Sequence, residues 1–250
     1  METNHGKKHP DYKCLRVPFS IEIMQATLKL LRFFLAALIL ISCSHKQEIS
    51  IDDHTYYPTD SGSVADFDVT KTVYTVAQKP QTTTYKLRQT ITGSYKNIDG
   101  TPVYKLLYTS TEKNNAWHQD SSTILWRTID KVIMHETGMP VVKLLFPLFN
   151  GATWNANLYN AQSETMVSVH AKGKPYVIGN TTYPNTITII RQDDSTSLSR
   201  NRHIEIYAAE IGLVLKEKVF LRYCQNPDCL GKGQIISGYH EKLVLKTYSK

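Results

Sequence analysis

Apolar and polar residues alternate along much of the chain beyond residue 60. Phe67, Val69 and Val73 occupy one parity, and Asp and Thr residues occupy the other. Tyr85, Leu87 and Ile91 repeat the alternation, with Lys, Arg and Thr in the outward positions. Successive side chains of a strand point to opposite faces of a sheet. A period of two therefore predicts strands that bury one face and expose the other.

Further runs rich in β-branched and aromatic residues predict more strands. They cover residues 103–109, 123–128, 132–136, 141–146, 166–171, 186–191, 213–223 and 239–248. Asn97-Ile98-Asp99-Gly100 supplies a turn before the first of these, because Gly accepts the positive φ that hairpin turns demand. Helical periodicity is scarce, and only residues 202–209 are expected to form a short helix.

This strand content predicts a mainly β domain over residues 56–250. Ten candidate strands exceed one small flat sheet, and no βαβ pattern connects them. We therefore expect a single antiparallel, strongly curved sheet or half-open barrel with at most one or two short helices. A two-sheet β-sandwich is the alternative, since the number of strands does not separate the two architectures.

The N-terminal region has the pattern of a secretory signal. Lys29 and Arg32 precede an uninterrupted apolar run over residues 33–41. In a helix this run would rise about 14 Å, roughly half of a bilayer's hydrocarbon core, so it is too short for a permanent transmembrane helix. We expect a cleaved signal over residues 24–42 and a polar tether over residues 43–55.

Residues 1–23 precede the start of this signal at Met24. They are polar and aperiodic, and they are either an upstream mis-assigned start or an unusually long basic n-region.

The end of the signal matches a known processing motif. Leu40-Ile41-Ser42-Cys43 resembles the bacterial lipobox, and this resemblance implies that diacylglycerol alkylates the Cys43 thiol and that cleavage occurs before it. Two or three acyl chains hold a protein firmly on a membrane. Ser44 follows, where Asp retains enterobacterial lipoproteins at the inner membrane, so the resemblance implies an outer-membrane location. The alternatives are a plain thiol after an ordinary signal peptide and a buried strand over the apolar run.

Two later segments carry a wider resemblance. Residues 144–157 (LLFPLFNGATWNAN) resemble the strand, Pro, turn-Gly and Trp segment of many uncharacterised lipoproteins of Bacteroidota, and residues 207–217 (YAAEIGLVLKE) resemble a late segment of the same proteins. Tyr-Tyr-Pro at residues 56–58 fits their usual opening, although the expected Gly and Trp near residues 62–67 are not both present. The resemblance covers most of residues 24–250. It implies a fold similar to the lipoprotein carriers, with a concave apolar face, and no assigned activity.

Composition excludes several classes of protein. The chain has 250 residues, of which 41% are hydrophobic and 10% aromatic, so it is neither disordered nor collagen-like. Of the net charge of +7, residues 1–43 contribute six Lys or Arg and three acids, which leaves +4 for residues 44–250. These Lys and Arg residues are dispersed among Thr, Tyr and aliphatic residues rather than gathered in a stripe. We therefore expect no nucleic-acid partner.

Cys224 and Cys229 lie between two predicted strands. In an oxidising envelope compartment we expect them to form a disulfide that pins a turn, with two free thiols or a metal site as alternatives. His203-Ile204-Glu205 resembles the His-x-Glu of zinc deaminases, but the Pro-Cys-x-x-Cys that this family requires is absent. We predict no metal site.

No catalytic motif is recognisable. No serine lies in a Gly-x-Ser-x-Gly elbow, and neither a P-loop nor a dinucleotide-binding glycine pattern occurs. Adjacent acids at residues 52–53 and 193–194 are expected to be solvated turns. We predict no catalytic residue and no cofactor other than the covalent lipid on Cys43.

Aromatic residues are the remaining candidates for binding. Trp117, Trp126 and Trp154 are either sheet core or the lining of a groove for a lipid, peptide or glycan. We expect a non-enzymatic, lipid-anchored outer-membrane protein, facing the periplasm or the cell surface, that binds an apolar ligand or an envelope protein. The alternatives are a structural or assembly component and an unrecognised hydrolase.

Overall fold

The computed structural model describes residues 51–111 and 116–250, all within one structural unit, and the predicted signal and Cys43 lie outside these ranges. In chain order the elements are η1 (Ile51–Tyr56), β1 (Val64–Tyr74), β2 (Gln81–Lys96), β3 (Pro102–Thr111), β4 (Trp117–Arg127), β5 (Lys131–Glu136), β6 (Met139–Leu145), β7 (Thr153–Asn155), β8 (Met166–Ile178), β9 (Thr181–Ser195), β10 (Ser199–Ala208), β11 (Gly212–Tyr223) and β12 (Ile235–Ser249).

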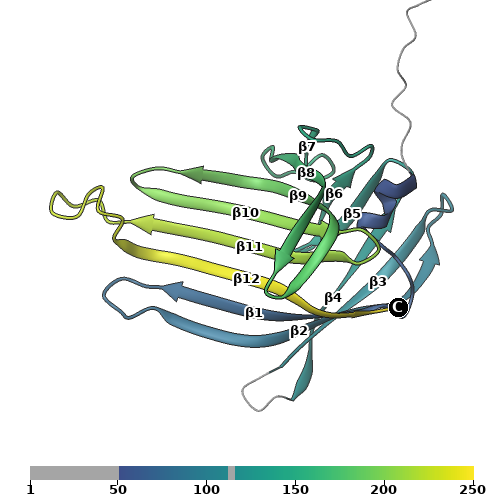
Figure 1. Ribbon diagram of the computed structural model, residues 1–250, viewed down its shortest axis with the longest axis horizontal. Helices are drawn as coiled ribbons and strands as arrows, with labels where there is room; N and C mark the ends of the chain where they lie inside the picture. The colour runs from purple at the N-terminus through teal and green to yellow at the C-terminus, as the bar shows by residue number, and fades with distance from the viewer. Residues whose placement is uncertain (1–50, 112–115) are drawn as a thin grey trace, which may run out of the picture. The chain divides into compact units, whose positions relative to one another are not determined.

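All twelve described strands belong to one antiparallel sheet (Figure 1). Their order is β6-β5-β4-β3-β2-β1-β12-β11-β10-β9-β8-β7, so two six-strand meanders meet where β1 pairs with β12. Within the described ranges η1, a single 3-10 helix, is the only helix. The prediction of a mainly β, strongly curved single sheet is confirmed, and the two-sheet sandwich does not form.

The sheet curls until its two ends meet. The backbone N–H of Val142 on β6 donates to the carbonyl of Ala156, just after β7, at 2.9 Å, and the Trp154 indole Nε1 donates to the Val142 carbonyl at 3.1 Å. Strands β6 and β7 stand at opposite ends of the strand order. The sheet is therefore a nearly closed barrel rather than an open layer.

An apolar core fills the barrel where its ends meet. Its buried members come from β2 to β10, from η1 and from connecting residues; they include Tyr56, Ile91, Leu106, Leu125, Val132, Leu144, Leu148, Trp154, Val167, Ile187, Ile189 and Tyr207. Asp53 of η1 is buried and accepts a hydrogen bond from the Leu148 backbone N–H at 2.9 Å, and Lys172 pairs with the same carboxylate. Residues 51–55, predicted as part of the tether, therefore belong to the folded domain.

A second apolar cluster has members on both faces of the sheet, and Ile204, Ile206 and Leu215 belong to its outer part. The β8–β9 hairpin bends at Ala171 and Gly173, which both have positive φ, and the pairing register of the two strands shifts there. Tyr183 near the hairpin tip joins Ile204 and Ile206 of β10 in this cluster. Figure 1 shows the hairpin crossing in front of β10 and β11.

The helix predicted over residues 202–209 is wrong. These residues lie in or directly after β10, where Ile204 and Ile206 belong to the outer part of the second cluster while Glu205 and Tyr207 face the barrel interior. Both faces of this strand are buried, and the inward face carries the charged residue Glu205. Because a charged residue occupies a buried position, the alternation of apolar and polar residues that marks a strand is not visible here.

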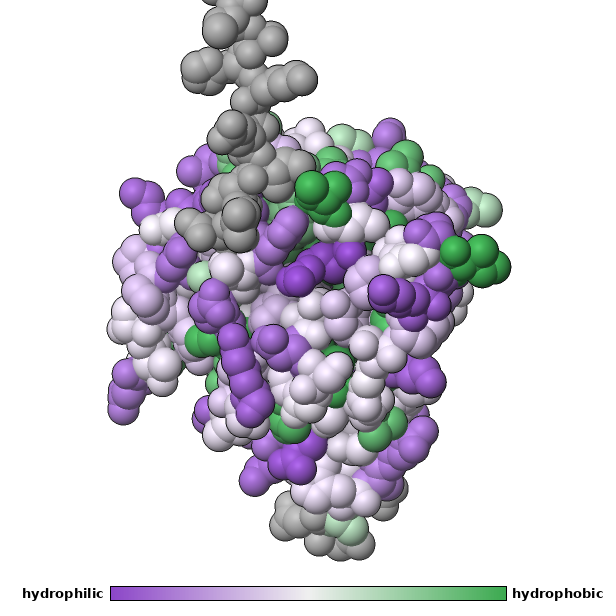
Figure 2. All heavy atoms as spheres, turned by 90° about the vertical axis from the view of Figure 1, so that its right-hand side faces the viewer, coloured by the Kyte–Doolittle hydropathy of each residue, from purple (hydrophilic) through white to green (hydrophobic). Residues whose placement is uncertain are grey.

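Among the described residues, no helix has the length and apolar character needed to cross a membrane. The face shown in Figure 2 is mostly hydrophilic or intermediate in hydropathy, and hydrophobic side chains occur on it singly.

Candidate functional site

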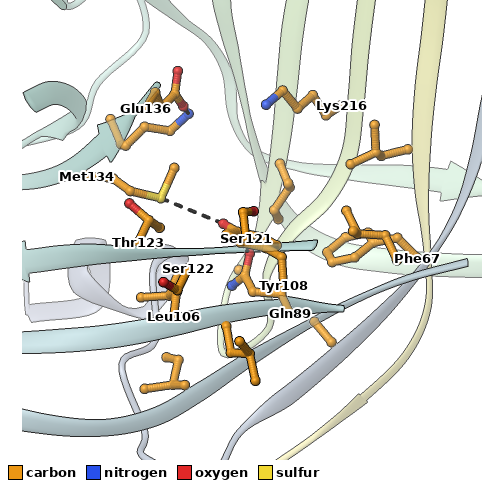
Figure 3. Close-up of a pocket in the computed structure, with 18 of the residues that line it drawn as sticks. Phe67, Gln89, Leu106, Tyr108, Ser121, Ser122, Thr123, Met134, Glu136 and Lys216 are labelled. Atoms are coloured by element: carbon orange, nitrogen blue, oxygen red, sulfur yellow. Dashed lines mark hydrogen bonds and ion pairs between the residues drawn. The ribbon is translucent and has the colours of Figure 1, made fainter. Parts of the chain in front are cut away.

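The concave side of the sheet holds a cavity of about 1120 Å³. Its walls are formed by inward-facing side chains of β1 to β6 and of β10 to β12, with Tyr57 and Pro58 after η1. Figure 3 looks into this space. The cavity continues the barrel interior beyond the region that the apolar core fills.

One wall of the cavity is apolar. Phe67 on β1, Leu87 and Ile91 on β2, Leu106 on β3 and Leu213 on β11 all line it. From Tyr85 to Ile91 on β2 the lining positions have the predicted inward parity of the alternation, and the register shifts after Ile91. The strand period therefore creates the apolar surface directly.

A polar band lies across this wall. Ser121, Ser122 and Thr123 of β4 line the cavity, and Tyr108 donates a hydrogen bond to Gln89 Oε1 at 3.2 Å. The Tyr108 hydroxyl also contacts the Met134 sulfur at 3.9 Å, as Figure 3 shows. Burial raises the pKa of Tyr108, so this phenol stays protonated and serves as a donor.

A group of buried charged side chains, which we call the ion cluster, lies at the inner wall: Glu136, Lys143, Arg191, His203 and Glu205. Glu136, Lys143 and Glu205 line the cavity, and Arg191 and His203 contact Glu205. Glu205 is 0% exposed and Lys143 is 2% exposed. Lys143 Nζ lies 2.8 Å from Glu205 Oε1 and 2.6 Å from Glu136 Oε1. One ammonium group thus bridges two carboxylates from β5 and β10.

Glu205 has a full set of donors. Its Oε1 faces Lys143 and, at 3.2 Å, His203 Nε2, while its Oε2 accepts from the Tyr207 hydroxyl at 2.7 Å and lies 3.7 Å from Arg191 Nε. A carboxylate held by this many donors has little capacity to accept a further proton. We therefore interpret Glu205 as the centre of a fixed network rather than as a base.

The cluster keeps its acids ionised. Burial raises the pKa of Glu205, but the charges of Lys143 and Arg191 outweigh it and hold that pKa well below its usual range. The same balance between burial and these two cations lowers the pKa of Glu136 to about 2. Burial lowers the pKa of His203 to about 4, so its imidazole is neutral at pH 7.

Two further lysines enter the cavity beside the cluster. Lys216 and Lys218 are alternate residues of β11, and both line the cavity. Lys216 Nζ lies 3.9 Å from Glu205 Oε1, and Figure 3 shows its side chain opposite Glu136. We call Lys216 and Lys218 the lysine pair.

The three tryptophans, which the sequence left as either sheet core or groove lining, do not line the cavity. Trp154 is buried in the apolar core, and Trp126 packs against that core with its ring 5.4 Å from the His135 ring. Trp117 is 42% exposed and lies under the Arg88 guanidinium, 4.6 Å from the ring centroid. Trp154 faces the barrel interior, but it lies in the part that the apolar core fills. These positions fit the core and cross-strand interpretation.

The structure joins Cys224 and Cys229 by a disulfide in the β11–β12 connection, with their Cα atoms 5.7 Å apart. This loop does not contribute to the cavity. Cys43, the predicted lipidation site, lies outside the described residues.

The ion cluster was not predicted, although His203 and Glu205 had drawn attention as a fragment of a zinc motif. In the described ranges no three His, Cys, Asp or Glu side chains converge as a metal site would require. The sequence offered one indication: Glu205 and Tyr207 alternate with Ile204 and Ile206, as they would on the two faces of a strand. The partners Lys143 and Arg191 come from distant strands.

Two serine–histidine pairs occur in the sheet. Ser110 Oγ lies 3.2 Å from His118 Nε2, and Ser168 Oγ lies 3.1 Å from His170 Nε2. Within residues 51–111 and 116–250 neither imidazole is hydrogen-bonded to a carboxylate, so neither pair forms a Ser-His-acid triad.

No protein-family model and no curated protein sequence matches the chain. Solved structures similar to it include two from Bacteroides fragilis and Parabacteroides distasonis. One, from Bacteroides fragilis, is described as a "putative exported protein with YmcC-like fold"; it is 12% identical, covers 78% of this chain and 98% of its own, and has a TM-score of 0.42. The other, described as a "putative lipoprotein" from Parabacteroides distasonis, is 10% identical with the same coverages and a TM-score of 0.39. At these TM-scores we infer neither family nor function from them.

Proposed function

We propose that this protein is a non-enzymatic, lipid-anchored protein of the bacterial outer membrane, facing the periplasm or the cell surface, that binds an amphipathic small molecule in the cavity on the concave face of its sheet. The cavity is the observation that carries the proposal. Its volume of about 1120 Å³ is slightly larger than the 300–1,000 Å³ typical of small-molecule sites. The anchor at Cys43 and the membrane location rest on the sequence alone.

The lining supports a ligand with two kinds of surface. Leu87 and Leu213 offer an apolar wall, whereas Glu136 and Lys216 bring charge to the inner wall. A purely apolar ligand would remove solvent from Lys216, whose ion pair with Glu205 is long at 3.9 Å, and this is costly. A purely polar ligand would gain nothing from the leucines.

The ion cluster supports binding over catalysis. Its central carboxylate, Glu205, is saturated by donors from Lys143, His203 and Tyr207, so it holds neighbouring strands in fixed positions. A preformed wall reduces the ordering cost when a ligand binds.

Titration with a neutral apolar fluorophore tests the proposal. N-phenyl-1-naphthylamine added to the purified protein should show saturable, blue-shifted emission. Leu87→Glu, which places a charge on the apolar wall, should weaken this binding about tenfold or more. Thr84→Glu is the matched control, because Thr84 is exposed on the same strand and does not line the cavity.

Native mass spectrometry of protein isolated from its own membrane provides a second test. A retained small molecule is expected in the wild type and is expected to be lost in Leu87→Glu. If the fluorophore signal is non-saturable, or equal in both glutamate variants, the cavity is not a binding site.

A further inference from the structure

We propose that Lys216 and Lys218 form a subsite for an anionic group, so that the ligand is an amphiphile with a carboxylate or phosphate head and an apolar body. This proposal rests on the proposed function and assigns the chemistry of its ligand. It is carried by the placement of two lysines at successive inward positions of one strand, next to an apolar wall.

The two lysines share one face of β11. Residues two apart on a strand are separated by about 6.6 Å along it and point the same way. Leu215 and Glu217 face the other side, where they line a small outer depression with Lys242. The alternation therefore directs both ammonium groups into the cavity, where one anion can contact both.

Neither lysine has a dedicated counterion. Lys216 lies 3.9 Å from Glu205, but that carboxylate is already held by Lys143 at 2.8 Å. In the described parts of the chain no carboxylate forms an ion pair with Lys218, and its neighbour across the sheet, Glu241, pairs with Lys71 at 3.8 Å. The carboxylates near the lysine pair are thus already in ion pairs with other cations.

The charge around the ion cluster is positive. Four cations, Lys143, Arg191 and the lysine pair, stand against the two carboxylates of the ion cluster. Two more carboxylates line the cavity: Glu241, which pairs with Lys71, and Asp120 on β4. His203 contributes no charge at pH 7, because burial lowers its pKa to about 4. An anion with one or two negative charges would neutralise this excess.

The environment of Lys218 agrees with this assignment. Burial, and next the charge of Lys216, lower the pKa of Lys218 to about 8, so the ammonium form is strained by both effects while remaining the main form at pH 7. A bound anion relieves both effects. The apolar body of the ligand would then run over Leu213 on the same strand and Leu243 on β12, which line the adjoining space.

The experiment compares an anionic amphiphile with its neutral form. Cis-parinaric acid and its methyl ester are titrated by fluorescence into the purified wild type, into Lys216→Met/Lys218→Met, and into Lys242→Met as the outer-face control. The wild type and the control should bind the acid about tenfold or more tightly than the ester. The double variant should bind both equally while retaining the affinity of the wild type for the ester.

Lys218→Arg is the rescue variant, because it keeps the charge and should keep the preference for the acid. Retained ester binding shows that each variant is folded. Equal binding of acid and ester by the wild type would overturn the lysine subsite and leave the proposed function standing. Absence of binding for both compounds would overturn the proposed function itself.

A competition arm separates the two sources of an anion. Hexadecyl phosphate should displace parinaric acid from the wild type, whereas inorganic phosphate at the same concentration should not. If inorganic phosphate displaced parinaric acid and hexadecyl phosphate did not, the ligand would be a free anion, and the amphiphile assignment would be contradicted.

Discussion

Lys143 Nζ lies 2.8 Å from Glu205 Oε1, and this ion pair links β6 to β10 across the barrel interior, 62 residues apart in the sequence. Both side chains are almost completely buried. A buried pair is weak evidence of net stability, but removal of one partner leaves an uncompensated charge. This ion pair therefore holds strands from the two halves of the sheet together, and removal of either charge should destabilise the fold.

Glu205→Gln should therefore lower the free energy of unfolding by about 3 kcal/mol or more, because Lys143 and Arg191 lose the carboxylate that neutralises them. Urea unfolding monitored by circular dichroism measures the change. Glu210→Gln is the control: Glu210 is exposed and pairs with Lys250 at 3.2 Å, so its loss should cost less than about 1 kcal/mol. Equal effects of the two variants would contradict this account of the cluster.

His203 should make stability depend on pH. Burial lowers its pKa to about 4 in the folded protein, whereas an imidazole in an unfolded chain titrates near 6.5. Between these values the unfolded state binds more protons, so the free energy of unfolding falls as the pH decreases from about 6.5 to about 4. This contribution is fully present above pH 6.5.

The check is urea unfolding of wild type and His203→Gln across this pH interval. The variant should lose less stability than the wild type, by on the order of 3 kcal/mol. His240→Gln removes a half-exposed imidazole paired with Glu217 and serves as the control. Parallel pH profiles for wild type and His203→Gln would refute the assignment.

The disulfide should act locally. Cys224 and Cys229 close a loop of few residues, and in the loop-entropy model such a closure contributes about 2 kcal/mol at most. Cys224→Ser/Cys229→Ser should therefore still fold, with a loss of unfolding free energy within that limit and faster proteolysis confined to residues 224–234. Failure of the double variant to fold would show that the loop supports the whole sheet.

Lipidation of Cys43 is tested in cells. Radiolabelled palmitate should enter the wild-type protein and Cys14→Ala, because Cys14 precedes the predicted signal, but it should not enter Cys43→Ala. The Cys43→Ala protein should also leave the membrane fraction, since its acyl chains supply the anchoring free energy. Label in Cys43→Ala would contradict the lipobox assignment.

Strand periodicity predicted the fold where one face is apolar and the other polar. On β2, Tyr85, Leu87 and Ile91 face the cavity, as their parity indicated. The same rule failed where that contrast is missing. Strand β7 has only three residues, and the first half of β4 is exposed on both faces, so neither gives an alternating pattern.

The ion cluster was beyond the reach of sequence patterns. From the sequence alone Glu205 is expected to be exposed to solvent, because a charged side chain is seldom buried without an ion-pair or hydrogen-bond partner. Those partners, Lys143 and Arg191, lie 62 and 14 residues away and become neighbours only through the curl of the sheet. The tryptophans left two interpretations open, since a tryptophan alone does not reveal which face of a strand it occupies.

The last prediction concerns Gly238 on β12, where the close approach of β11 leaves no room for a side chain. Its φ is +126°, and a Cβ at this position would lie 1.9 Å from the Phe220 carbonyl oxygen of β11. Gly238→Ala therefore forces the β11–β12 pairing apart and should destabilise the protein by about 3 kcal/mol. Gly93→Ala on β2 is the matched control, since its Cβ would meet no atom within 4 Å and its φ is not positive. Urea unfolding should show little change for the control, whereas similar stability of the two variants would mean that β12 does not pair with β11 in this register.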